Sequence, residues 1–214
     1  ETPLLRINPF AFPQDIHILE HIDRLVEIFN ACWPMYAAMP AVLKDAIERS
    51  YQKVGWDLRN SESEKGVFPT FFDLLDILPG VIEESHYSKD TQSDYVGALC
   101  TRVKSLTNGI YGSVFCAEDA LSDAELFDCN VVVDLSRVGS METKSLLMGI
   151  LVMKLQEYRM CGSEMNSRLR HVTVLEEAHN LLRKTSAEQS QEGANLQGKS
   201  VEMLANAIAE MRTY

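Results

Sequence analysis

Residues 171–179 have the sequence His-Val-Thr-Val-Leu-Glu-Glu-Ala-His, a β-branched run that ends in two adjacent acids. A second run of this kind, Asn130-Val-Val-Val-Asp-Leu-Ser136, also carries a carboxylate at its end. Between them, apolar residues at helical spacing predict a long helix after Gly139-Ser140, with a core face of Leu147, Leu151, Leu155 and Tyr158. Continuous apolar strands that alternate with helices are typical of a parallel sheet covered on both faces. The predicted fold class of this part is therefore α/β.

Residues 15–112 show a different pattern, with apolar residues three and four positions apart and no convincing strand. Asp15 is the expected N-cap of the first helix. Thr70 is the expected N-cap of a helix from Phe71 to Leu78, which Pro79-Gly80 should end. The apolar face predicted for the first helix is Ile18, Ile22, Leu25, Phe29 and Cys32. A helix opened by Pro40 is predicted to carry Leu43, Ile47 and Val54. A later helix is predicted to carry Tyr95, Leu99, Val103 and Leu106.

The composition limits the class of protein. The chain has 214 residues, is 46% hydrophobic and 24% charged, and carries a formal net charge of −11. Such an acidic surface argues against a dedicated nucleic-acid coat or membrane-surface protein, so any contact with DNA requires a local basic patch. The five cysteines are scattered, with no C-x-x-C pair, which indicates reduced thiols and a cytoplasmic location. No apolar stretch approaches the roughly 20 residues of a membrane helix.

The two acids at the end of the run 172–175 have the form of a Walker B element. Successive side chains of a strand point in opposite directions, so Glu176 and Glu177 can perform different tasks. One acid of such a pair holds the hydrated Mg²⁺ ion, and the other orients and polarises the attacking water. The alternative is that the acids only start a loop or occupy the first turn of a helix.

Two other motifs match known patterns less completely. His17-Ile-Leu-Glu-His21 fits the H-x-x-E-H pattern of inverted zinc peptidases. However, the apolar face of that helix favours two polar positions on its solvent side, and we expect no zinc there. Gly193-Ala-Asn-Leu-Gln-Gly-Lys-Ser200 fits the phosphate-binding loop pattern G-x-x-x-x-G-K-[ST]. The polar residues 184–192 cannot form the buried strand that such a loop needs, so a loop glycine and a helix N-cap at Ser200 are favoured.

Three segments, Asn130-Val-Val-Val-Asp-Leu-Ser-Arg137, Val174-Leu-Glu-Glu-Ala-His-Asn-Leu-Leu182 and Glu210-Met-Arg-Thr-Tyr214, together resemble the HerA/FtsK-like ATPases of bacteria and archaea. The resemblance implies a partial RecA-like parallel sheet with flanking helices, formed by residues 1–14 and 113–214, plus an inserted all-helical subdomain over residues 15–112. The opening Leu5-Arg-Ile-Asn-Pro-Phe10 is similar to the strand that follows the nucleotide loop in this family.

By the same resemblance, the protein is expected to be part of a P-loop ATPase, a hexameric DNA translocase or helicase that uses ATP and Mg²⁺. Glu176 would take the metal-side role, Glu177 would be the catalytic glutamate, and Arg212 would sense or stabilise the γ-phosphate. An arginine at a helix C-terminus is the alternative for Arg212. The family's Walker A loop precedes its Walker B element, and no residues before Glu176 match it. The expectation is a piece that begins downstream of that loop, lacks the strand after Tyr214 and is inactive by itself.

Other functions remain open on the sequence alone. A non-catalytic binding or assembly module could use the same acids as helix caps. A conjugation- or secretion-type ATPase shares the core described above and acts on protein instead of DNA. A zinc peptidase is the third class, carried only by His17 and His21.

Overall fold

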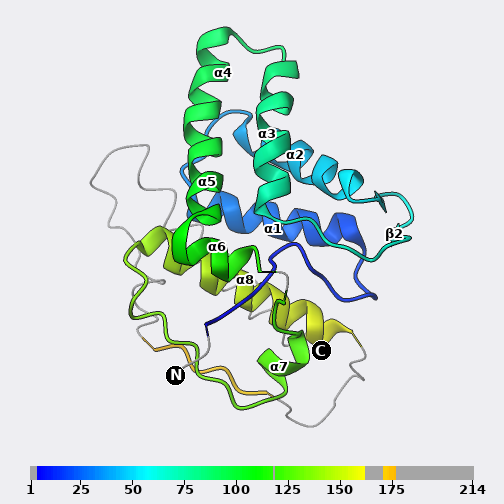
Figure 1. Cartoon of the computed structure of the whole chain (residues 1–214), viewed down its shortest axis with the longest axis vertical. Helices are drawn as coiled ribbons and strands as arrows, with labels where there is room; N and C mark the ends of the chain where they lie inside the picture. Colours follow the sequence, from blue (N-terminus) through cyan, green and yellow to red (C-terminus); the bar gives the residue numbers. More distant parts are fainter. Residues whose placement is uncertain (1–3, 118, 162–170, 177–214) are drawn as a thin grey trace. The chain divides into compact units, whose positions relative to one another are not determined.

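The computed structural model describes residues 4–117, 119–161 and 171–176. These residues are 58% helical, and their one sheet is a two-stranded antiparallel hairpin. The predicted α/β class, with a RecA-like parallel sheet, is therefore wrong for the described part of the chain (Figure 1). The helical character predicted for residues 15–112 is confirmed, except that this stretch also contains the hairpin.

The error lies in the valine-rich runs. Residues 130–135 and 171–175 form no regular secondary structure, and neither run forms a backbone ladder with any described residue. An extended run becomes a strand only when a neighbour supplies partners for its N–H and C=O groups. Without such a neighbour the side chains remain in solvent, and Val132 and Val174 are 91% and 79% exposed. A β-branched composition gives the extended backbone conformation, while the sheet requires a second strand.

The chain divides into two compact units. Unit 1 comprises Glu1–Phe12, His17–Asp23 and Tyr36–Leu121. Unit 2 comprises Pro13–Ile16, Arg24–Met35 and Ser122–Tyr214. Helix α1 (Ile18–Cys32) contributes its first residues to unit 1 and the rest to unit 2. All five residues of its predicted apolar face are buried, which confirms that face. Its N-cap is not Asp15, because the helix begins at Ile18.

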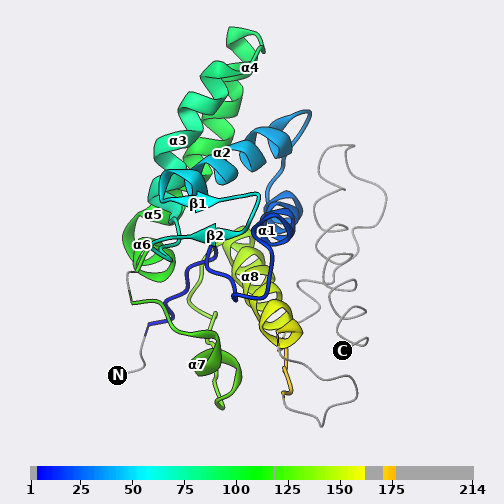
Figure 2. The same ribbon diagram turned by 90° about the vertical axis from the view of Figure 1, so that its right-hand side faces the viewer.

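Unit 1 is built on α2 (Met39–Lys53) and α3 (Phe71–Glu84), which pack against each other. Pro40 lies in the first turn of α2, as predicted, and Leu43 and Ile47 are buried. In the sequence, α2 and α3 are connected by the hairpin of β1 (Trp56–Asp57) and β2 (Glu62–Ser63), in which Trp56 pairs with Ser63. Figure 2 shows the two strands side by side.

Helix α3 does not end at Pro79 as predicted. Thr70 caps its start, and the helix continues through Pro79 to Glu84. A proline inside a helix removes one backbone hydrogen bond, at a cost of about 3 kcal/mol in an isolated helix. Val81 and Ile82, beyond the proline, are buried along with Phe71, Leu74 and Leu78. The burial of this continuous apolar stripe offsets the loss and keeps the helix intact.

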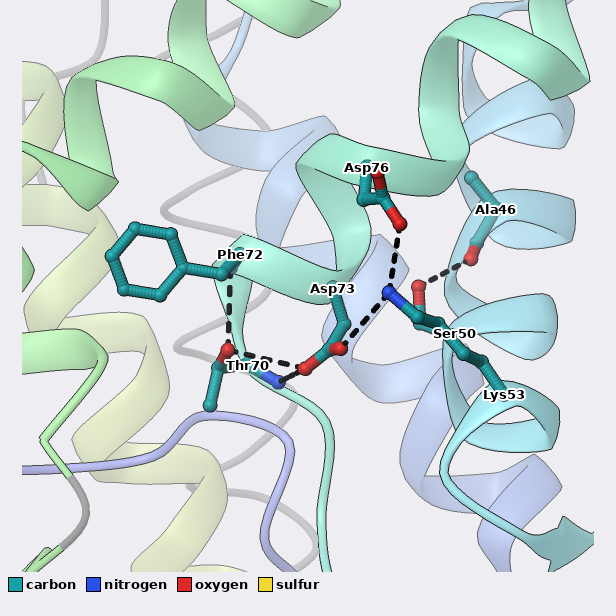
Figure 3. A network of polar contacts seen from close by, with 7 residues as sticks. All are labelled: Ala46, Ser50, Lys53, Thr70, Phe72, Asp73 and Asp76. Carbon is teal, nitrogen blue, oxygen red and sulfur yellow. Dashed lines mark hydrogen bonds and ion pairs between the residues drawn. The ribbon is translucent and has the colours of Figure 1, made fainter.

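Polar contacts join the end of α2 to the start of α3 (Figure 3). Asp73 accepts a hydrogen bond from the backbone N–H of Thr70 at 2.9 Å, which completes a capping box. Its other oxygen lies 3.3 Å from Nζ of Lys53, which also reaches Asp76 at 2.8 Å. The hydrogen bond to Asp76 raises the pKa of Lys53 above its ordinary value. Asp73 thus serves both the helix cap and the contact between the two helices.

The rest of unit 1 is a helical rod and a short helix. α4 (Lys89–Tyr95), the π-helical turn η1 (Val96–Cys100) and α5 (Thr101–Thr107) follow one another without a break and lie beside α3 (Figure 1). The predicted face Tyr95, Leu99, Val103 and Leu106 is fully buried, across the π turn. α6 (Gly109–Phe115) follows, and its Val114 carbonyl accepts a hydrogen bond from the backbone N–H of Ile7 at 2.8 Å.

Unit 2 contains α7 (Asp123–Phe127) and α8 (Met141–Met160), which begins after the N-cap Ser140. Leu147 and Leu155 of its predicted core face are buried, whereas Leu151 and Tyr158 are half-buried. Within the described residues, no helix has the combination of length and apolar composition required to cross a membrane.

Candidate functional site

The segment 171–176, which carries the first of the two acids, is attached to unit 2 at its first residue. Nδ1 of His171 lies 2.9 Å from the carbonyl oxygen of Phe127, so the ring donates a hydrogen bond to the end of α7. The two rings also contact edge to face, with centroids 6.1 Å apart. Nε2 of His171 lies 2.9 Å from Oγ1 of Thr173. These contacts fix the start of the run and leave Val172 and Val174 in solvent.

Glu176 ends this run in a turn, and its side chain is exposed. Its carboxylate forms no hydrogen bond or ion pair with another described residue. The carboxylate is therefore accessible to a ligand from solvent. Glu177 and Arg212, the two predicted catalytic residues, lie outside the described residues, as does the loop-like motif Gly193–Ser200.

The run 130–135 ends in a local turn at Asp134. Oδ1 of Asp134 accepts a hydrogen bond from the backbone N–H of Ser136 at 2.8 Å. Hydrogen bonds from Ser136 hold the pKa of the Asp134 carboxyl below its ordinary value. Asp134 is also exposed, so each of the two valine-rich runs presents one carboxylate to solvent.

A magnesium ion at Glu176 would need most of its ligands from elsewhere. Among residues 4–117, 119–161 and 171–176, no group of three or more His, Cys, Asp or Glu side chains could hold a metal by itself. Mg²⁺ usually keeps several waters and binds proteins through one or two carboxylates together with substrate phosphates. A single accessible carboxylate such as Glu176 meets that requirement, whereas a closed site for zinc needs four protein ligands.

The histidines of the H-x-x-E-H motif have separate structural roles. His17 precedes the first residue of α1, so the two rings are not both on the helix. His21 is fully buried, and its ring lies 5.0 Å from that of Phe12. The prediction that both histidines face solvent is therefore wrong for His21. The zinc interpretation required both imidazoles on one accessible helix face, and this arrangement does not provide it.

A set of charged contacts in unit 2 was not predicted. Lys154 of α8 is buried and lies 3.1 Å from Asp123, and the buried Glu157 lies 3.2 Å from Arg24. One turn of α8 thus places charges of both signs in the interior of unit 2. The sequence signal was the presence of Lys154 and Glu157 among apolar residues of a helix with little amphipathic character.

Asp128, at the end of α7, is held by the last turn of α8. It accepts a hydrogen bond from the Tyr158 hydroxyl and pairs with Arg159 at 2.9 Å. The hydrogen bond to Asp128 raises the pKa of Tyr158. Arg159 also donates to the carbonyl oxygen of Phe127 at 2.7 Å, the same oxygen that His171 contacts. The charged contacts of α8 therefore support the attachment point of the segment that ends in Glu176.

Comparison of the chain with protein-family models, with curated proteins and with solved structures found no match. The functional interpretation therefore rests on the residues and contacts described above.

Proposed function

We propose that this chain supplies the Walker B-type acids of an ATP-hydrolysing motor that moves or unwinds DNA, as in the HerA-like ATPases that its motifs resemble. The observation that carries the proposal is the segment 171–176. It is held at its first residue through His171 and ends in the exposed carboxylate of Glu176, directly before Glu177. The proposal concerns the activity and does not depend on a parallel sheet among the described residues.

In this proposal Glu176 and Glu177 have different roles. Glu176 would hold the hydrated Mg²⁺ ion, which would supply positive charge to neutralise the phosphates of ATP. Glu177 accepts a proton from the attacking water and orients it. Arg212 stabilises charge on the transferred phosphoryl group. Six copies of the full-length protein would form the ring through which DNA passes.

The test is the ATPase activity of the full-length protein with Glu177→Gln. Glutamine keeps the size and hydrogen-bonding reach of glutamate but cannot accept the proton. We expect turnover to fall by about a hundredfold or more, in line with the loss of a positioned general base, while ATP binding survives. Glu176→Gln should lower turnover and also raise the Mg²⁺ concentration needed for half-maximal rate. Glu64→Gln, at an exposed acid, is the matched control and should change neither quantity.

The same assay separates DNA from protein as the substrate. A DNA motor should hydrolyse ATP several times faster when duplex DNA is present, with a stimulation that weakens as salt rises. A secretion-type ATPase that acts on protein should show no such stimulation.

A non-catalytic assembly module is the second candidate. The observation in its favour is the helical character of the described residues, with no sequence before Glu176 that fits a phosphate-binding loop. Near-normal turnover of Glu177→Gln would support this candidate, because the acids would then be ordinary loop or helix-start residues.

A further inference from the structure

The first turn of α1 is capped by an unusual residue, His17. The carbonyl oxygen of His17 accepts hydrogen bonds from the backbone N–H groups of Glu20 and His21, at 3.0 and 3.1 Å. Its ring atom Nδ1 accepts another from the N–H of Leu19, at 3.2 Å. His17 is therefore the N-cap residue of α1, in the place where Ser, Thr, Asp or Asn is usual.

The remaining N–H group of this turn is satisfied from the hairpin, 43 residues further along the chain. Oγ of Ser61 accepts a hydrogen bond from the N–H of Ile18 at 2.9 Å. Nε2 of His17 lies 3.3 Å from the carbonyl oxygen of Arg59, in the same hairpin loop. Asp57 shapes this loop by accepting hydrogen bonds from the N–H of Arg59 and the side chain of Asn60. The loop thus contacts the start of α1 through the side chain of Ser61 and the backbone carbonyl of Arg59.

These contacts distinguish between the two tautomers of the neutral His17 ring. A backbone N–H can only donate, so Nδ1 must carry no proton to bind Leu19. A carbonyl oxygen can only accept, so Nε2 must carry the proton to bind Arg59. Only the neutral Nε2–H tautomer makes both hydrogen bonds.

We propose that His17 is a pH-sensitive latch between α1 and the β1–β2 hairpin. A proton on Nδ1 removes the acceptor for the Leu19 N–H group. The Nδ1–H and Leu19 N–H groups then point at each other and repel. It also places a positive charge at the positive end of the helix dipole. Because the ring is rigid, turning Nδ1 away from Leu19 also moves Nε2 away from Arg59. The latch is closed when the ring is neutral and open when it is charged, so acidification opens it.

The charged groups near the latch come from both elements. Glu20 lies in the first turn of α1, and Asp57, Arg59 and Glu62 lie on the hairpin. Histidine is the side chain that ordinarily changes its charge between about pH 5 and about pH 8. His21 lies in the same turn of α1, so the His17→Asn variant below separates the effect of His17 from that of His21.

The first test uses the unmodified chain and needs no variant. A long-range ¹H–¹⁵N spectrum of the imidazole groups at about pH 8 should show His17 as the Nε2–H tautomer. The protection of the Leu19 amide against hydrogen exchange, corrected for the intrinsic pH dependence of exchange, should fall about fivefold between about pH 8 and about pH 5, the effect of losing a typical N-cap. An Nδ1–H tautomer, or a Leu19 protection that does not change, would overturn the proposal.

Three variants separate the latch from general acid sensitivity. His17→Asn supplies an N-cap acceptor that does not titrate, so Leu19 should stay protected at both pH values. His86→Asn changes an exposed histidine elsewhere in unit 1 and should leave the fall in protection intact. Ser61→Ala should lower the protection of Ile18 equally at both pH values. If His17→Asn loses protection on acidification as the unmodified chain does, His17 is not the latch.

Discussion

Oε1 of Glu157 lies 3.2 Å from Nη1 of Arg24, and the Glu157 side chain is fully buried whereas that of Arg24 is 24% exposed. A buried carboxylate is stable as an anion only when partners replace its lost hydration. Sequence position gave no indication of this contact, because the two residues are 133 positions apart. The pair ties α1 to α8 within unit 2.

Replacement of Arg24 by methionine tests this pair. The charge of Glu157 would lose its cationic partner, and we expect the free energy of unfolding to fall by about 2 kcal/mol, below the usual range for buried pairs because Arg24 is partly in water. The double variant Arg24→Met/Glu157→Leu removes the buried charge as well and should be more stable than Arg24→Met alone. Urea denaturation of the variants measures both effects. Additive losses in the double variant would show that the two side chains do not interact.

Two glycines should respond oppositely to alanine. Gly80 lies in α3, and apart from its chain neighbours and the adjacent helix backbone no atom lies within 4 Å of the position that an alanine methyl group would take there. Gly80→Ala should therefore stabilise the chain by about 0.5–1 kcal/mol. Gly112 is its control, because a Cβ there would lie 2.4 Å from the carbonyl oxygen of Thr107. Gly112→Ala should therefore destabilise the chain. Thermal unfolding compares the two, and equal shifts in Tm would contradict the packing around them.

Cys32 and Cys129 should differ in their reactivity toward an alkylating agent. Burial raises the pKa of the Cys32 thiol to about 12, and the nearby carboxylate of Glu142 adds to the shift. A thiol with this pKa is about 0.01% thiolate at pH 8, and only the thiolate reacts. Cys129 is exposed. Iodoacetamide at pH 8 should label Cys129 first, and Cys32 only under denaturing conditions, as peptide mass spectrometry would show.

Periodicity predicted the helical faces well, because apolar spacing records burial directly. The buried face of α1 and that of α4 to α5 were both identified from the sequence. Local stop signals were less reliable. Pro79-Gly80 is a strong stop signal, yet burial of Val81 and Ile82 carries α3 past it. Tertiary packing therefore sets where α3 ends, and the dipeptide Pro79-Gly80 alone gives no information about that packing.

The candidate site could be predicted only as a set of residue types. The β-branched run at residues 171–175 could be read from the sequence, but the attachment of His171 to Phe127 is a contact across 44 positions. The cap of α1 was missed for the same reason, since Ser61 and Arg59 come from a distant hairpin. Asp15 was a reasonable N-cap by residue type alone. The structure instead uses an imidazole, a residue type for which N-cap rules give no signal.

The last prediction concerns nucleotide binding by the 214-residue chain itself. Glu176 and Glu177 contact a nucleotide mainly through a metal ion, and most affinity for ATP comes from the backbone N–H groups and lysine of a phosphate-binding loop. Titration calorimetry with ATP and Mg²⁺ should therefore give no micromolar dissociation constant. Gly193–Ser200 is the one segment that matches the loop pattern. If ATP does bind tightly and Lys199→Ala abolishes the binding, that segment is a working phosphate loop. The resemblance would then place the acids and the loop in the wrong order, and the proposed roles of Glu176 and Glu177 would have to be abandoned.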